Sequence, residues 1–115
     1  KVFSELEKSV ENSSEIMFKL ELAAREMLAN AIEHGCALAA ENAENLRIRI
    51  GLVISADELF FKVEDPGPGF DWENYDLDKM PKFEEKGRGL KMINQVSDKM
   101  KFNSTGNKIT AVFKL

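Results

Sequence analysis

The chain is poor in several residue types, and each shortage removes a class of protein. Its single cysteine, Cys36, excludes an intramolecular disulfide and any zinc site made of several cysteines. No apolar run approaches the roughly 18 residues that span a membrane, and no signal peptide is visible. Basic runs are also lacking, and the net charge of -4 disfavours a nucleic-acid binder. We therefore expect a cytoplasmic protein that binds neither a membrane nor nucleic acid.

The composition that remains is that of a globular domain. The 115 residues are 43% hydrophobic, which is enough for one ordinary core without disulfides or a structural metal. We therefore expect a single domain over residues 1–115. Because the sequence begins directly in a helical pattern, it is also consistent with a piece of a longer protein.

Apolar periodicity predicts helices first and strands afterwards. Helical spacing runs over residues 1–11 and 15–35, with a break at 12–14. Residues 46–54 and 59–64 alternate as the two strands of an antiparallel hairpin. A further helix is predicted over 87–100, and strands are predicted at 101–103 and 109–115. This order favours an α+β fold, a two-layer sandwich with helices on one face of a mostly antiparallel mixed sheet.

A turn rich in glycine and proline follows the second strand. Asp65 stands at the end of that strand, and Gly67 and Gly69 let the backbone come close to a flat ligand. Read alone, this pattern is equally typical of a plain strand-exit turn. The segment of about twenty residues that starts here has no sustained period, and a loop of that length usually binds something or moves.

The long predicted helix carries a narrow polar stripe of Lys19, Glu26, Asn30 and Glu33, with apolar residues on both sides. One interpretation is the exposed face of an amphipathic helix. The other is that Glu26 and Asn30, one turn apart, look into a cleft. There a carboxylate can act as a base and an amide oxygen can bind a hard cation.

Two more glycines, Gly87 and Gly89, stand where the last predicted helix begins. Free backbone N–H groups at a helix start suit a phosphate, and Lys86 and Arg88 add positive charge there. A hinge or a helix cap gives the same pattern, and no P-loop sequence is present.

Taken in order, the three motifs resemble the N, G1 and G2 boxes of the GHKL ATPase superfamily, which binds ATP in the Bergerat, or histidine kinase-like, fold. The boxes read Glu26-x-x-x-Asn30-Ala31-x-x-His34-Gly35, Asp65-x-Gly67-x-Gly69-Phe70 and Gly87-x-Gly89-Leu90. The chain most resembles the small bacterial anti-sigma factors that are also serine/threonine protein kinases, the RsbW and SpoIIAB type. The resemblance covers nearly the whole chain, from Ser14 to Leu115.

The resemblance implies a role for each matched residue. Glu26 would be the general base for the attacking hydroxyl, and Asn30 would coordinate the Mg²⁺ that bridges the ATP phosphates. Asp65 would hold the adenine amino group in a pocket shaped by Gly67 and Gly69. The phosphate contacts would come from the third box and its neighbour, which are Lys86, Gly87, Arg88, Gly89 and Leu90.

The function implied is transfer of the ATP γ-phosphate to a serine of an anti-sigma-factor antagonist, together with sequestration of a sigma factor. Phosphoryl transfer requires little beyond in-line positioning, a metal and charge neutralisation. Two alternatives stay open. One is a nucleotide-dependent protein-binding switch without kinase activity, and the other is the catalytic ATP-binding domain of a sensor histidine kinase. Glu26 favours catalysis, and the lack of a phosphoacceptor-histidine helix favours a protein substrate in trans.

The chain also departs from the family pattern. Residues 71–86, which would form the ATP lid, are short and acidic and include Trp72 and Tyr75, which would pack over the nucleotide or on the domain. The family's first strand is not evident before Lys1, and because such proteins commonly dimerise through that part, homodimerisation stays open. The only histidine, His34, is expected to cap or pack the helix end rather than to transfer protons.

Overall fold

The structure is a computed structural model that describes residues 2–36, 47–69 and 85–115. Helix α1 (Val2–Asn30) passes directly into the π-helical segment η1 (Ala31–Cys36). Strands β1 (Arg49–Ile54) and β2 (Glu58–Glu64) follow. Helix α2 (Glu85–Val96) then leads into β3 (Lys99–Phe102) and β4 (Lys108–Lys114).

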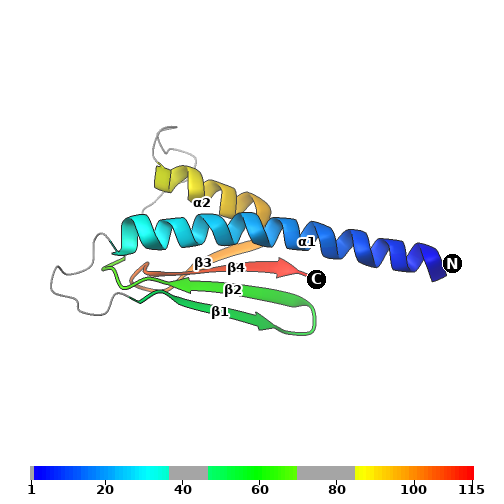
Figure 1. Ribbon diagram of the computed structural model, residues 1–115. Helices are drawn as coiled ribbons and strands as arrows, with labels where there is room; N and C mark the ends of the chain where they lie inside the picture. Colours follow the sequence, from blue (N-terminus) through cyan, green and yellow to red (C-terminus); the bar gives the residue numbers. More distant parts are fainter. Residues whose placement is uncertain (1, 37–46, 70–84) are drawn as a thin grey trace.

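The four described strands form one sheet in the order β1-β2-β4-β3. Each neighbouring pair in it is antiparallel, and β4 lies between β2 and β3, with Ile109 opposite both Val63 and Phe102. Helices α1 and α2 lie on the same face of this sheet, and no helix of the described residues lies on the opposite face (Figure 1). The predicted two-layer α+β sandwich is confirmed.

The hydrophobic core fills the space between the helices and the sheet. Because side chains alternate along a strand, every second residue of β2 and β4 points toward the helices. These residues pack against small and apolar residues of α1 that are spaced four apart. Their buried members are Ala23, Met27, Ala31, Leu59, Val63, Leu90, Ile93, Ile109, Ala111 and Phe113. The small alanines on α1 let the helix lie close to the sheet and to α2.

The predicted break at residues 12–14 is wrong, because α1 is continuous from Val2 to Asn30. Serine costs a helix only a few tenths of a kcal/mol, and good helix formers surround Ser13 and Ser14. An ion pair one turn further on, between Lys19 Nζ and Glu15 Oε1 at 3.2 Å, adds local support.

The end of the second helix also differs from the prediction, which continued it to Met100. Helix α2 ends at Val96, where the Ser97 hydroxyl donates to the Ile93 carbonyl oxygen at 2.6 Å. The Asp98 amide already donates to the Val112 carbonyl at 2.8 Å, so the chain has joined the sheet by this point. Met100 fits the helical spacing by coincidence, because it is an inward-facing strand residue opposite Ala111.

Candidate functional site

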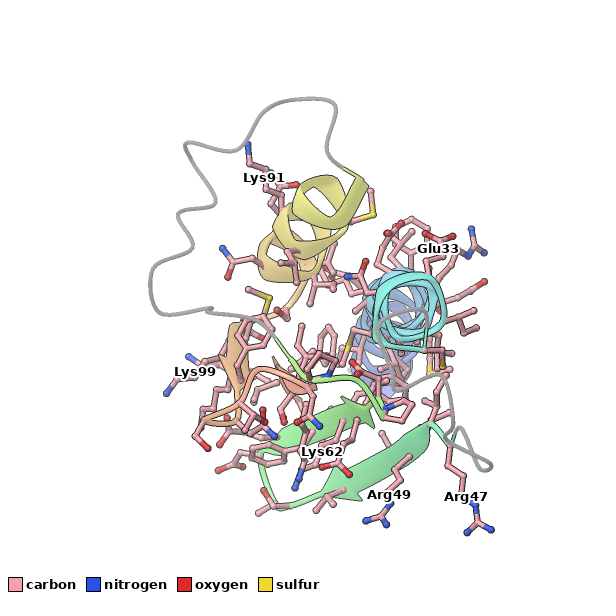
Figure 2. The ribbon with its side chains drawn as sticks, turned by 90° about the vertical axis from the view of Figure 1, so that its left-hand side faces the viewer. Glu33, Arg47, Arg49, Lys62, Lys91 and Lys99 are labelled. Atoms are coloured by element: carbon pink, nitrogen blue, oxygen red, sulfur yellow. The ribbon has the colours of Figure 1, made fainter. Side chains whose placement is uncertain are left out.

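The three sequence boxes come together at one end of the molecule. The C-terminal end of α1, the first turn of α2 and the end of β2 lie at the same side of the domain (Figure 1), and Figure 2 looks onto that side. The boxes are far apart in the sequence, so the antiparallel sheet and the pairing of the two helices assemble this end.

Glu26 and Asn30 lie on α1 beside Gly89 of α2. Both residues are half-buried, while the buried Met27 anchors this part of α1 in the core. A Cβ atom added to Gly89 would lie 3.0 Å from Glu26 Oε2 and 3.4 Å from both Oδ1 and Nδ2 of Asn30. Gly89 therefore allows α2 to approach these two polar side chains directly.

The other two members of the polar stripe lie outside this contact. Lys19 pairs with Glu15 near the middle of α1, and Glu33 is exposed in η1. The stripe thus divides into a half-buried pair that faces α2 and two residues in a solvated setting. The change from α-helix to π-helix follows directly after Asn30, and single π turns are frequent at functional sites.

The start of α2 differs from the sequence expectation by two residues. The helix begins at Glu85, so Gly87 lies inside its first turn instead of before it. The first four N–H groups of an α-helix have no partner within the helix, which places the Arg88 amide among the available donors. Leu90 is buried in the core, so we expect its side chain to position the helix and only its backbone to lie near a ligand. The side chains of Lys86 and Arg88 lie outside the described part of the structure.

Asp65 closes a tight turn at the end of β2. Its Oδ1 accepts a hydrogen bond of 2.8 Å from the Gly67 amide, an Asx turn that fixes the direction of the carboxylate. Gly67 itself is buried. The glycine-proline segment therefore has a defined shape, as the sequence pattern suggested.

The turn between β3 and β4 holds this segment in place. Gly69 has φ of +78°, and a Cβ on it would overlap the Thr105 carbonyl oxygen. The Asp65 amide donates to the Asn107 carbonyl at 2.9 Å. In return, the Asn107 Nδ2 group donates to the carbonyl oxygens of Asp65, at 3.2 Å, and Gly67, at 3.5 Å.

Asn103 completes this support, and sequence reasoning missed both asparagines. Its Oδ1 accepts from the amides of Gly106, Asn107 and Lys108 at 2.8, 3.1 and 3.2 Å, and its Nδ2 donates to Asn107 Oδ1 at 2.7 Å. The only sequence signal was a polar turn containing glycine. Such a turn does not show that its side chains reach a segment about 40 residues earlier.

Several predicted features lie outside the described residues. These are the ATP lid up to residue 84, with Trp72 and Tyr75, and the last residue of the G1 motif, Phe70. The backbone of His34 and Gly35 lies in η1, but their side chains are not among those described.

The donor set at the two helices fits a magnesium ion bound mainly through phosphate. Among the described residues, no group of three or more acidic, histidine or cysteine side chains gathers into a protein-only metal site. Mg²⁺ commonly takes one or two protein oxygens and completes its shell with phosphate and water, and the Asn30 amide can supply such an oxygen.

A comparison with protein families gives a match over residues 1–113 to a model described as a histidine kinase-like ATPase domain. No curated protein matches the chain significantly. The match confirms the resemblance to GHKL ATPases at the level of the family and indicates that the domain binds ATP. Within the described ranges, no helix combines the length and apolar character needed to cross a membrane.

Proposed function

The chain belongs to the histidine kinase-like ATPase family, and we propose that it is an ATP-dependent protein serine/threonine kinase of the anti-sigma-factor type. Such a kinase transfers the ATP γ-phosphate to a serine of an anti-sigma-factor antagonist in the cytoplasm and sequesters a sigma factor. ATP and Mg²⁺ are the cofactors of the proposed reaction.

The observation that carries this proposal is that the Glu26 and Asn30 side chains lie so close to Gly89 that a Cβ atom there would be 3.0–3.4 Å from them. A base and a cation ligand lie one helical turn apart, beside the start of a helix whose free amides attract phosphate. A protein that only held ATP would need the helix start and the cation ligand. The carboxylate of Glu26 is the extra group that supports transfer.

The proposed reaction uses Glu26 as a general base. The substrate serine Oγ attacks the γ-phosphorus, the new O–P bond forms as the bond to the β–γ bridging oxygen breaks, and ADP leaves. The serine proton passes to Glu26. Phosphoryl transfer depends mainly on positioning and charge stabilisation, which the amides at the start of α2 would supply.

Asn30 is the residue we assign to Mg²⁺, which when bound neutralises charge on the phosphates. At the other end of the site, we assign the adenine amino group to Asp65. Its carboxylate is held by the Gly67 amide, and its backbone is held by Asn107. This double restraint keeps the carboxylate ready for a directional hydrogen bond.

Phosphate transfer with labelled ATP tests the proposal directly. The protein is incubated with Mg²⁺, ATP and candidate antagonist proteins, and the same reaction is run with Glu26→Gln. The Gln variant keeps the size of the side chain and removes the base, so we expect transfer to fall at least about a hundredfold while ADP binding is retained. Glu21→Gln is the matched control, because Glu21 is exposed on the same helix and only pairs with Arg25.

The chemistry of the product separates the alternatives. Phosphoserine survives acid, whereas phosphohistidine is hydrolysed, so an acid-labile product would point to the histidine kinase reaction. Nucleotide-dependent partner binding without a labelled product would support the switch without kinase activity. Full transfer by Glu26→Gln would refute the general-base assignment.

A further inference from the structure

Positive charge is concentrated on the sheet face opposite α1 and α2, which is called the outer face below. Alternation along the strands turns one set of residues away from the helices, and the cross-strand register places them in rows. Arg49 and Lys62 show this direction in Figure 2, where both point away from α1. The basic members of this outer face are Arg49, Lys62, Lys99, Lys101, Lys108 and Lys114, and its acidic members are Glu58 and Glu64.

This distribution is opposite to that of the whole chain. The protein has a formal net charge of -4, yet six basic side chains and two carboxylates share this one face. Segregated charge of this kind produces a local positive potential on an acidic protein, which steers oppositely charged partners. Exposure of this face to solvent explains why its residues are polar. It does not explain why positive side chains outnumber negative ones there.

A hollow of about 240 Å³ lies within the outer face. Its lining consists of Arg49, Ile50, Gly51, Lys62, Glu64 and Lys108. It lies over Gly51, which has no side chain and stands opposite Lys62. The Arg49 side chain is 81% exposed, and its ion pair with Glu64 is long at 3.8 Å, so Glu64 offsets its charge only weakly.

We propose that this outer face binds an acidic protein segment, with carboxylates of the partner seated in the hollow over Gly51. Lys62 and Lys108 lie on the neighbouring strands β2 and β4, one outward row apart, and together with Arg49 they surround the hollow on the sheet surface. Carboxylate side chains can pair with these cations in the arrangement of a complementary interface.

A protein partner fits this face better than nucleic acid or a lipid surface. The neighbouring outward row is apolar over β1, β2 and β4, where it contains Val53, Phe60 and Val112, and it ends on β3 at Lys99. Cations beside an apolar row are typical of protein interfaces, whose centres are apolar and whose rims are polar.

Docking here leaves the candidate ATP site accessible. Glu26, Asn30 and Gly89 lie on the helical layer, and the outer face is on the other side of the sheet. Binding of a partner to the outer face can therefore be tested independently of phosphoryl transfer. An acidic partner and a nucleotide should bind at the same time.

The test uses fluorescein-labelled poly-L-glutamate of about 20 residues as the probe, followed by fluorescence anisotropy. We expect binding at low ionic strength that weakens at least about tenfold between ~20 and ~200 mM salt, because the contacts are exposed ion pairs. Lys62→Glu combined with Lys108→Glu should weaken binding at least about tenfold. The matched control is Lys19→Glu with Arg25→Glu on α1, which changes the net charge equally and should change affinity less than about twofold.

A second variant, Gly51→Val, separates the contribution of the hollow to binding from that of the charged side chains. At Gly51 a Cβ would meet Lys62 atoms at 3.7 and 3.9 Å, an ordinary contact, so Gly51→Val should fold normally while filling the hollow. We expect Gly51→Val to weaken probe binding several-fold, although the charge of the protein is unchanged. In a separate measurement, saturating ATP should leave the affinity for the probe unchanged. Circular dichroism of each variant verifies folding.

Three results would overturn the proposal. The first is equal loss of affinity in the outer-face and α1 charge reversals, because binding would then follow net charge alone. The second is unchanged probe binding in the Lys62 and Lys108 double variant. The third is tighter binding of duplex DNA or phosphatidylserine vesicles than of polyglutamate under the same salt conditions, which would assign the face to phosphate.

Discussion

At the scale of single residues, Gly89 is where packing and proposed chemistry meet. The residue lies inside α2, where alanine is normally favoured over glycine by about 0.5–1 kcal/mol. Because Gly89 has no Cβ atom, the side chains of Glu26 and Asn30 have room beside the helix at this position. The structure therefore gives a local reason for a glycine at a position where helix propensity opposes it.

We predict that Gly89→Ala separates stability from activity. The thermal midpoint should stay equal or rise, because alanine suits the helix interior. Phosphate transfer should fall by about tenfold or more, because a Cβ 3.0 Å from Glu26 Oε2 forces the carboxylate to move. Calorimetry and the labelled-ATP assay measure the two effects. Unchanged transfer would show that the position of Glu26 does not matter.

Gly69 presents the opposite case, in which the backbone itself requires glycine. Its φ of +78° is disfavoured for other residues, and its Cα lies against the backbone of Thr105. We predict that Gly69→Ala lowers the free energy of unfolding by more than about 1 kcal/mol in urea titrations. Gly51→Ala is the control, since it adds only ordinary contacts and should change stability far less.

At the scale of elements, the β3–β4 turn acts as the support of the Asp65 segment. The side chain and backbone of Asn107 bond across to Asp65, and Asn103 in turn fixes Asn107. Hydrogen bonds between two loops cost little to form once β2 and β4 are paired, because the pairing already brings the loops together. The shape of the candidate adenine pocket therefore depends on a turn that contributes no residue to the three boxes.

We predict that Asn107→Ala loosens this segment. The change removes the side-chain bonds to the carbonyls of Asp65 and Gly67, so the amide of Gly67 should exchange with solvent faster and ADP affinity should drop several-fold. Hydrogen-exchange mass spectrometry and calorimetry measure the two quantities. Thr105→Ala provides the comparison, because it deletes one exposed bond to Asn107 and should have the smaller effect.

At the scale of the whole molecule, one core joins the helical layer to the sheet. Phe113 and Met27 are both about 1% exposed, and they come from β4 and α1. The candidate ATP site lies across both helices and the end of β2, so its geometry depends on this core staying intact.

We predict that Phe113→Ala lowers the free energy of unfolding by about 3–5 kcal/mol, because it removes a large side chain and leaves a cavity. That is a large part of the 5–15 kcal/mol typical of a whole domain. Val53→Ala, at a strand position that is 49% exposed, should cost less than about 1 kcal/mol. Chemical denaturation measures both, and similar losses would contradict the assignment of the core.

The sequence by itself determined the kinds of element, their order and the three motifs. Helical and strand periodicities are local properties of the backbone, so the residues of β2 and β4 were predicted almost to their ends. Boundaries were less certain where one pattern suits two structures. Met100 matched the helix by spacing but belongs to β3, because pairing with β4 had already begun.

Only the tertiary structure decided which distant groups meet. It placed Gly89 against Glu26, it tied Asn107 to Asp65, and it collected the lysines of three strands on one face. None of these contacts has a local signature, because each depends on which strands pair and which helices pack, and that is set by burial of the common core. The sequence supplied the chemical groups, and long-range packing gave them their neighbours.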